Sequence, residues 1–239
     1  MIRIENLTKK FEGKAAIDGL NLNIKKGSIY GLVGVNGSGK TTAIKHLAGI
    51  YKADSGKVTL EEQDIYDNPA IKARIGYVSD ELYFFNSYSL KRLARFYKNL
   101  YKTFNHERFN KLVGSMGLDI KRRVTGFSKG MQKQVALILS LSIMPDFLLL
   151  DEPIDGLDPI VRKKVFEEII DDVAARQMTV LISSHNLKEM DGICDTIGII
   201  KDGKMLMEKD LDDLKASMTG EPSLDEIFIY IYENGGSND

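Results

Sequence analysis

Gly34-Val35-Asn36-Gly37-Ser38-Gly39-Lys40-Thr41-Thr42 is the stretch that decides how this 239-residue chain folds. It fits the pattern Gly-x-x-x-x-Gly-Lys-Ser/Thr, which binds phosphate groups where a strand leads into it and a helix follows. The apolar run 29–33 predicts that strand, and residues 43–49 predict the helix. Glycines let the backbone turn tightly, so that its N–H groups form an anion nest beside the positive end of the helix dipole. The stretch therefore predicts a site for a nucleoside triphosphate.

Every residue of this phosphate loop, defined as residues 34–42, is predicted to take part in binding the nucleotide. Lys40 has the charge and the reach to bind the terminal phosphates, and the Thr41 hydroxyl suits a Mg²⁺ ligand. A glycine-rich turn with a surface lysine is the alternative interpretation. The strand and the helix on either side of the loop weigh against that alternative.

Composition narrows the class of protein. The length allows one large domain, or one domain with an inserted subdomain. A net charge of −1 gives no strong overall attraction to nucleic acid or to an anionic membrane. A single cysteine, Cys194, cannot form an internal disulfide, which is consistent with a reducing cytosol. No apolar run approaches the roughly 20 residues that span a bilayer, so we expect the protein not to cross a membrane by itself.

The remaining pattern predicts an α/β fold. Residues 147–150 form a short, wholly apolar run that is typical of a central parallel strand. Helical spacing dominates residues 85–145, where Ser128 is a good N-cap and Pro145 closes the helix that Ser128 begins. The other expected elements are a first strand around residues 2–7, a strand pair within 17–24, strands at 57–60, 75–78 and 179–184, a helix from Pro159, a hairpin over 196–200 and 204–207, an amphipathic segment over 224–229 and a frayed end at 235–237.

Two carboxylates follow the apolar run 147–150. Ligands of open α/β sheets sit at the carboxyl edge of the strands, which is where Asp151 and Glu152 are expected. In a triphosphatase Asp151 would hold Mg²⁺, and Glu152 would polarise the attacking water as a general base. Neighbouring residues on a strand point to opposite faces, so the two carboxylates should not share one role. The alternative is that both are helix caps or surface charges.

With these motifs the chain resembles the ATP-binding cassette (ABC) ATPases, the ATP-hydrolysing subunits of membrane transporters. The resemblance covers residues 1–212, which it divides into a nucleotide core at 1–84 and 146–212 and a helical subdomain at about 85–145. Residues 213–239 are then a C-terminal extension. The matching motifs are the phosphate loop, the run 147–152, the D-loop Gly156-Leu157-Asp158, the switch histidine His185, the signature Phe127-Ser128-Lys129-Gly130-Met131-Gln132 and the aromatic Phe11.

The resemblance implies an α/β P-loop nucleotide-hydrolase core with a mainly parallel sheet, N-terminal antiparallel strands and an inserted helical subdomain. It implies ATP and Mg²⁺ as ligands and a head-to-tail dimer. In that dimer Ser128 and Gly130 of one chain contact the ATP held by the other chain's phosphate loop. Phe11 would stack on adenine, Asp158 would lie at the nucleotide, and His185 would hold the attacking water against the γ-phosphate.

Two departures from the family pattern affect the expected site. Asp80 stands where the family commonly has a glutamine that contacts Mg²⁺ and water; Asp80 is expected to ligate Mg²⁺ and to add negative charge. In the signature, Lys129 adds a positive charge near the partner's ATP, and Met131 removes a polar contact. Such variants resemble the ATPase subunits of small exporters, including those for peptide antibiotics.

The aromatic-rich segment 83–104 has two interpretations. Its rings either build the core of the helical subdomain or form a surface that receives a membrane permease.

The leading hypothesis is a cytoplasmic ATPase at the inner face of the cell membrane. It would pair with a separate permease and a second ATPase chain, identical or related, without nucleic acid. The alternative is a soluble ABC-type mechanochemical ATPase acting on nucleic acid or ribosomes. The sequence shows no heptad run and no evident basic patch, and both observations weigh against this alternative. A third hypothesis is a module that binds ATP without hydrolysing it, and the full catalytic set speaks against it.

Overall fold

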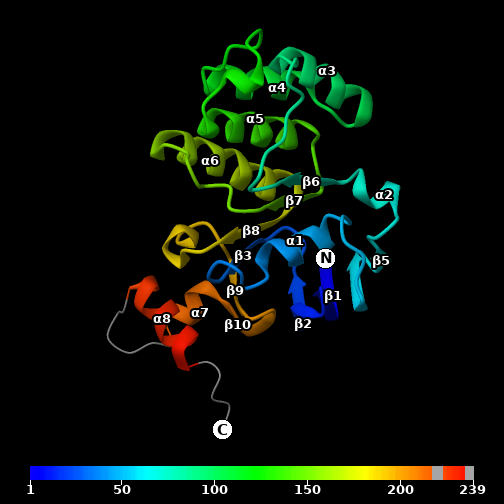
Figure 1. The fold of residues 1–239 in the computed structure, drawn as a ribbon. Helices are drawn as coiled ribbons and strands as arrows, with labels where there is room; N and C mark the ends of the chain where they lie inside the picture. The colour runs from blue at the N-terminus through cyan, green and yellow to red at the C-terminus, as the bar shows by residue number, and fades with distance from the viewer. Residues whose placement is uncertain (217–222, 235–239) are drawn as a thin grey trace.

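Two β-sheets lie beneath a layer of helices in the computed structural model, which describes residues 1–216 and 223–234 (Figure 1). The strands are β1 (Ile2–Phe11), β2 (Lys14–Ile24), β3 (Ile29–Val33), β4 (Ser55–Leu60), β5 (Gln63–Asp64), β6 (Ile75–Val78), β7 (Phe147–Leu150), β8 (Thr179–Ser184), β9 (Thr196–Lys201) and β10 (Lys204–Asp210). The α-helices are α1 (Lys40–Leu47), α2 (Pro69–Lys72), α3 (Leu90–Leu100), α4 (His106–Ser115), α5 (Lys129–Ser142), α6 (Pro159–Arg176), α7 (Leu211–Ala216) and α8 (Leu224–Asn234). The 3₁₀ helices are η1 (Val124–Gly126) and η2 (Leu187–Met190).

The larger sheet has the strand order β10-β9-β3-β8-β7-β6. Its neighbours run parallel except in the β9–β10 hairpin, which is antiparallel as predicted. Every residue of β3, β7 and β8 is buried, which explains why these strands appear in the sequence as apolar runs without alternation. Because β3, β7 and β8 are parallel, the segments that follow them meet at one edge of the sheet.

The smaller sheet is antiparallel, with the order β2-β1-β4-β5. The prediction of a strand pair within residues 17–24 is wrong, because these residues belong to the single strand β2. Irregularities in its pairing with β1, between Ile4 and Leu7 and again toward Lys10, let one long strand follow its partner to the turn. The predicted fold class is confirmed, with a mainly parallel core sheet, N-terminal antiparallel strands and a helical segment.

Helices α3, α4 and α5, which form the helical layer, come between β6 and β7 along the chain. In the sheet, β6 and β7 are direct neighbours. Each helix begins at a side chain that accepts a hydrogen bond from its first turn, namely Ser89, Asn105 and Ser128. Helix α5 is buried from Lys133 to Ser142 and ends there, ahead of Pro145, instead of being closed by the proline.

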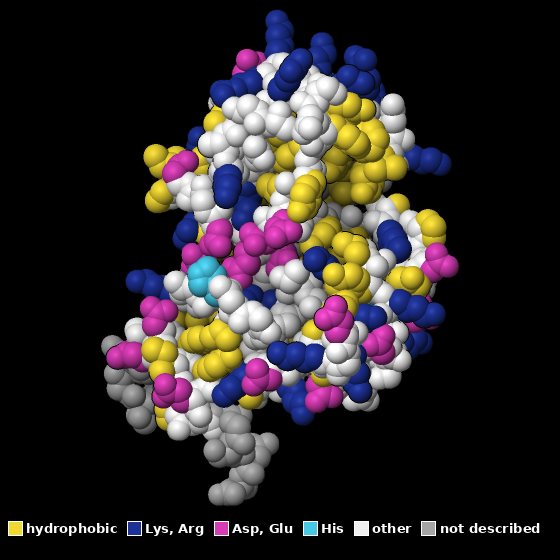
Figure 2. All heavy atoms as spheres, in the orientation of Figure 1, with side chains coloured by type: hydrophobic (Ala, Val, Ile, Leu, Met, Phe, Trp, Pro, Cys, Tyr) yellow, Lys and Arg dark blue, Asp and Glu magenta, His cyan; other side chains and the backbone are white. Residues whose placement is uncertain are grey.

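Lys and Arg side chains gather over the helical layer (Figure 2). Residues 90–123 contain ten Lys and Arg side chains but only two Asp and Glu side chains, in a chain whose net charge is −1. Backbone hydrogen bonds from Leu90 to Arg122 and from Lys91 to Ile120 join the start of α3 to the segment 120–123, and both are rich in basic residues. We call five exposed basic residues near these bonds, Lys91, Arg92, Arg95, Lys121 and Arg123, the cationic ridge. The ridge is a basic patch that the sequence analysis overlooked.

The C-terminal part folds back on the core. Helix α8 packs against η2 and β10, and its residues Leu224 and Ile227 are buried in the main hydrophobic core. The expected amphipathic segment is therefore confirmed as a helix, whereas the predicted frayed end at 235–237 lies outside the described residues. None of the helices described is both long enough and apolar enough to cross a bilayer.

Candidate functional site

The phosphate loop joins β3 to α1 as predicted. Gly39 is the N-cap of α1 with φ at 111°, and no side chain caps the helix, so the first-turn N–H groups stay open to an anion. A Cβ at Gly39 would lie 2.8 Å from the Ala16 carbonyl oxygen, which leaves glycine as the fitting residue. The loop is held from outside itself, because Gly34 N–H donates to the Ser184 carbonyl (3.3 Å) and Gly203 N–H donates to the Ser38 carbonyl (2.9 Å).

Three predicted catalytic groups meet at this loop. The buried Lys40 Nζ donates to the Gly34 carbonyl (2.7 Å) and lies 3.2 Å from Glu152 Oε1. The other carboxylate oxygen of Glu152 accepts a hydrogen bond from His185 Nδ1 at 3.0 Å. Glu152 thus lies between the lysine and the histidine. Asp155, which the sequence analysis missed, brings a carboxylate oxygen within 4.8 Å of Glu152 and His185.

Asp151 occupies a different position from Glu152, in keeping with the separate roles predicted for them. Its fully buried carboxylate accepts hydrogen bonds from the hydroxyls of Thr41 (3.1 Å) and Ser183 (2.8 Å), both at Oδ1. The second oxygen, Oδ2, is buried without a hydrogen-bond partner among the described residues. Burial raises the pKa of the Asp151 carboxyl, and the two hydroxyl donors oppose that rise. A cation at Oδ2 would satisfy this oxygen.

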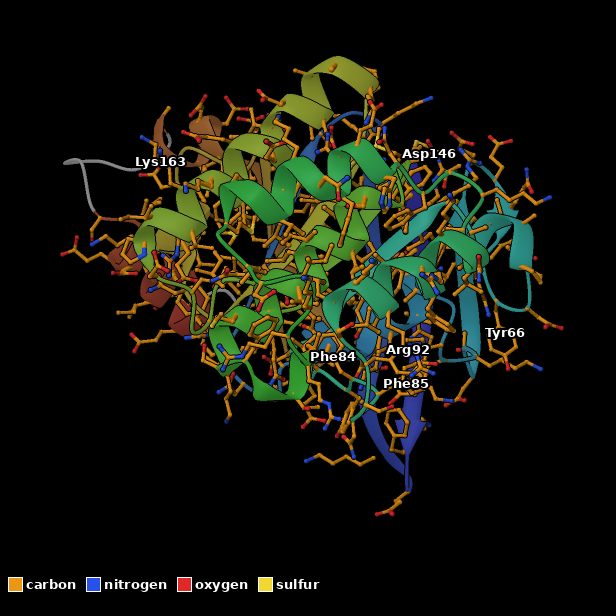
Figure 3. All side chains as sticks on the ribbon, turned by 90° about the horizontal axis from the view of Figure 1, so that it is seen from above. Tyr66, Phe84, Phe85, Arg92, Asp146 and Lys163 are labelled. Atoms are coloured by element: carbon orange, nitrogen blue, oxygen red, sulfur yellow. The ribbon has the colours of Figure 1, made fainter. Side chains whose placement is uncertain are left out.

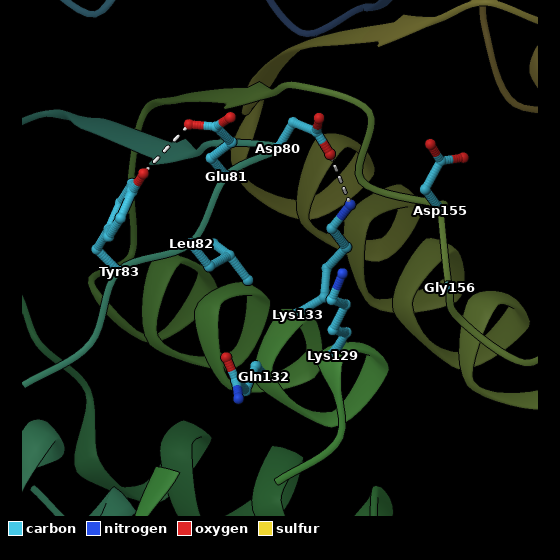
Figure 4. Close-up of a pocket in the computed structure, with 9 residues that line it drawn as sticks. All are labelled: Asp80, Glu81, Leu82, Tyr83, Lys129, Gln132, Lys133, Asp155 and Gly156. Atoms are coloured by element: carbon cyan, nitrogen blue, oxygen red, sulfur yellow. Dashed lines mark hydrogen bonds and ion pairs between the residues drawn. The ribbon is translucent and has the colours of Figure 1, made fainter. Parts of the chain in front are cut away.

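Asp80 lies beside the same loop but is already paired. Its Oδ1 is 3.3 Å from the Nζ of Lys133 in α5 (Figure 4). That Nζ also donates to the Glu152 carbonyl oxygen at 2.6 Å. Lys133 was missed because a lysine in a helix ordinarily faces solvent, whereas here it is only 5% exposed. Its neighbours Gln132 and Gln134 are polar, so the sequence around it gives no signal of burial.

Two cavities adjoin at Asp80. The smaller, about 190 Å³, is lined by Asn36, Gly37, Gly39, Lys40, Thr41 and Thr42 of the phosphate loop together with Ala16, Asp80 and Glu152. The larger, about 530 Å³, is lined by Asp80, Glu81, Leu82, Tyr83, Lys129, Gln132, Lys133, Asp155 and Gly156 (Figure 4). The larger cavity therefore connects the carboxylate edge of the sheet with the first turns of α5.

Phe11 is separate from this cluster. It ends β1, is 41% exposed, and meets Tyr51 edge-on with 5.4 Å between the ring centroids. The Lys9 ammonium lies 5.5 Å from the ring centroid of Phe11. The ring is not among the side chains that line the smaller cavity, but an exposed aromatic face at the end of a strand is open to a ligand.

The predicted second anion site lies at the N-terminus of α5. Ser128 caps the helix by accepting a hydrogen bond from Met131 N–H at 3.2 Å, and both Ser128 and Lys129 are exposed. A Cβ at Gly130 would stand 2.3 Å from the Gly156 carbonyl oxygen, so the backbones of the signature and the D-loop touch. Asp158 caps α6 by accepting from the N–H groups of Ile160 and Val161. These residues do not line the smaller cavity.

Some rings of the aromatic segment 83–104 are buried in the core, as the first interpretation expects, and others are exposed, as the second expects. Phe104 is buried, and Tyr97 and Tyr101 pack against the core. Tyr83 (88% exposed), Phe85 and Phe96 are exposed, and we call these three residues the aromatic surface. Phe85 lies near Arg92 of the cationic ridge, and both are labelled in the view from above (Figure 3). The guanidinium of Arg92 stacks 4.1 Å from the Tyr88 centroid, and Tyr88 in turn contacts Phe85.

Sequence comparison finds known proteins of one family that are similar to this chain. The family model described as ABC transporter matches residues 17–155. The ABC transporter ATP-binding protein YtrB of Bacillus subtilis is 34% identical, over 90% of this chain and 74% of YtrB. The lantibiotic transport ATP-binding protein SrtF of Streptococcus pyogenes is also 34% identical, over 95% of this chain and 96% of SrtF.

Solved structures share the fold. The ATP-binding subunit of an ABC transporter superposes with a TM-score of 0.88 at 21% identity, covering 97% of this chain and 99% of its own. A dimeric bacterial ABC transporter cassette gives a TM-score of 0.80 at 23% identity, covering 88% of this chain and 99% of its own. At these identities the likeness concerns the fold alone.

Proposed function

This chain belongs to the ABC transporter family as an ATP-binding subunit, and from that premise we propose that it hydrolyses ATP to drive a separate membrane permease. The observation that carries the proposal is the placement of Glu152 between Lys40 and His185, at the open end of the phosphate loop. A general base, a phosphate-binding cation and a polarising imidazole are thereby brought together where a triphosphate would end.

Each of these three side chains has a separate role in the proposed hydrolysis. The phosphate oxygens of ATP replace Glu152 as the partner of Lys40, because they carry more charge than one carboxylate. Glu152 then accepts a proton from the attacking water, and its hydrogen bond from His185 keeps the carboxylate oriented. His185 is partly exposed, and a second N–H at Nε2, present in the imidazolium form, would be free to donate to the γ-phosphate.

Mg²⁺ fits the residues on the sheet edge. Asp151 Oδ2 is a buried oxygen without a partner among the residues described, and Oδ1 is tied to the Thr41 hydroxyl. We propose that Asp151 and Thr41 hold Mg²⁺, since oxygen donors are the ligands this ion prefers. The ion would neutralise charge that develops on the phosphates. Asp80 is less free to join them because Lys133 holds it.

We propose that two ATPase chains act together. Ser128, Gly130 and Asp158 lie outside the cavity at the phosphate loop, so one chain does not bring both anion sites to one phosphate. A two-fold dimer would place the signature of one chain opposite the loop of its partner. The dimeric cassette of the same fold supports this arrangement.

Phe11 is proposed to stack on adenine. Substituting Phe11 by alanine should raise the KM for ATP about fivefold with little change in kcat, because an aromatic stack contributes about 1 kcal/mol. Steady-state hydrolysis against ATP concentration measures both constants. Phe11→Tyr serves as the control that keeps the ring. An unchanged KM in the alanine variant would contradict the stacking role.

The aromatic surface and the cationic ridge support a place at the membrane. Exposed aromatic rings suit a protein interface, and we propose that the permease binds there. The cationic ridge borders the aromatic surface through Arg92. With the permease bound at the aromatic surface, the ridge would therefore lie near the anionic inner leaflet of the membrane.

Binding to vesicles tests the ridge. Reversing two charges in Lys91→Glu/Arg95→Glu should weaken sedimentation with phosphatidylglycerol vesicles at least about tenfold, because each basic residue near such a surface contributes about 1 kcal/mol. The matched control is Lys25→Glu/Lys163→Glu, which makes the same change of net charge at exposed sites elsewhere. Equal binding to neutral phosphatidylcholine vesicles, or preference for RNA over both, would contradict the assignment.

Capture of the partner tests the proposed function as a whole. Tagged Glu152→Gln is expressed in the source cell and purified with Mg-ATP from detergent-solubilised membranes, with tagged Lys40→Ala as the control that binds ATP poorly. A co-purifying protein with several membrane spans supports the transporter assignment. Its identity would then decide whether lantibiotic transport, named for the relative SrtF, extends to this chain. Recovery with ribosomes or nucleic acid alone would favour the mechanochemical alternative.

A further inference from the structure

Lys133 connects three segments that are far apart along the chain. It projects from α5 in the helical layer, while its partners Asp80 and Glu152 follow β6 and β7 at the edge of the sheet. Its ammonium is held by the Glu152 carbonyl oxygen at 2.6 Å and by Asp80 Oδ1 at 3.3 Å, and Figure 4 shows it directed toward Asp80 from the wall of the larger cavity. A buried lysine is rare unless it is paired, so this arrangement calls for a role.

The backbone of Glu152 is the group that needs support. Its φ is 47°, in the left-handed region that residues other than glycine seldom adopt. Such a conformation costs about 1–2 kcal/mol and persists only where neighbouring groups hold it. Two hydrogen bonds do so here. The Glu152 N–H donates to Ser183 Oγ at 3.0 Å, and the Glu152 carbonyl accepts from Lys133.

We propose that Lys133 is a positioning residue for Glu152, an assignment that rests on the proposed ATPase function. Lys133 holds the carbonyl group of Glu152, and Ser183 holds the N–H group of Glu152. Together they fix the backbone on both sides of the general base. That backbone decides whether the carboxylate lies between Lys40 and His185. Asp80 acts through Lys133, because its carboxylate keeps the ammonium directed at the sheet edge.

Steady-state kinetics of substituted chains provide the first test. Lys133→Met keeps the length of the side chain and removes the charge. It should lower kcat about 10- to 100-fold, the range for a misplaced catalytic group, while KM for ATP stays within about twofold. Lys133→Arg restores a donor and should recover part of kcat. Lys98→Met, an exposed lysine of the same helical layer, is the control and should match the wild type.

A double-mutant cycle separates positioning from a general structural role. In a Glu152→Gln background, which already lacks the base, Lys133→Met should lower single-turnover hydrolysis by less than about twofold. A structural defect would instead reduce the rate by the same factor in both backgrounds, and that result would overturn the proposal. An increase in KM with unchanged kcat would overturn it as well.

Asp80→Asn provides a second variant, since the carboxylate is about half exposed and its loss does not threaten folding. We expect kcat to fall about 3- to 10-fold, with this effect also absent in the Glu152→Gln background. A shift in the Mg²⁺ concentration needed for half-maximal rate, without a change in kcat, would overturn the assignment of Asp80 to Lys133. If the wild type itself shows no ATP turnover, the proposed function fails before the role of Lys133 is reached.

Discussion

Glu152→Gln is expected to reduce ATP turnover by about 10²- to 10⁴-fold, the range that general-base catalysis contributes. Glutamine has nearly the same shape but cannot take the proton of the attacking water. It also removes the ion pair of 3.2 Å that occupies Lys40, so the affinity for ATP should be kept or raised. With binding intact and hydrolysis blocked, an ATP-bound dimer should accumulate. Single-turnover hydrolysis and size-exclusion chromatography with Mg-ATP measure the two effects.

Glu81→Gln is the matched control for that experiment. Glu81 lines the neighbouring cavity, and its carboxylate contacts the Tyr83 hydroxyl at 3.3 Å instead of the phosphate loop. Loss of this carboxylate should leave turnover within about twofold of the wild type, as expected for an exposed surface group. Turnover in Glu152→Gln within tenfold of the wild type would refute the role of Glu152 as the base.

Lys40→Ala is expected to weaken ATP binding by at least about 100-fold and to abolish turnover with it. Hydrogen bonds from a charged donor contribute about 1.5–3 kcal/mol each, and the loss of two such bonds to phosphate reaches that factor. The substitution also leaves the Glu152 carboxylate without its cation, directly beside the place where the triphosphate would bind. Equilibrium binding of a fluorescent ATP analogue measures the loss.

Lys45→Ala in the same helix is the control, because Lys45 lies near Tyr51 and not at the loop cavity. Circular dichroism establishes that both variants are folded. Affinity in Lys40→Ala within threefold of the wild type would contradict the role of Lys40. The two main substitutions should also differ in assembly, since only Glu152→Gln retains the ATP that closes the dimer.

Local signals explain why much of the architecture was predictable. The phosphate loop, the apolar strand 147–150 and the cap Ser128 each act through neighbours within a few residues, so sequence alone places them. The placement of Asp151 and Glu152 at the carboxyl edge of the sheet also followed from one rule, that ligands of open α/β sheets bind there.

What could not be predicted depends on contacts between distant segments. Lys133 is 53 residues from Asp80 in sequence, and nothing local shows that its ammonium turns inward to meet it. The left-handed backbone of Glu152 follows from the packing of its neighbours, since a glutamate gives no local signal for it. The long strand β2 was divided in the prediction because its irregular pairing disturbs the alternation on which strand recognition depends.

The hydrogen bond from Gly203 to the Ser38 carbonyl has a consequence for the cost of binding nucleotide. Because the β9–β10 turn and β8 hold the phosphate loop from outside, the loop has little conformational entropy left to lose when a ligand arrives. Nucleotide affinity thus depends on a turn 164 residues downstream of Gly39, in a region beyond the 17–155 match to the family model. A fragment that ended at residue 155 would carry every residue of the phosphate loop and lack the external restraints that order it.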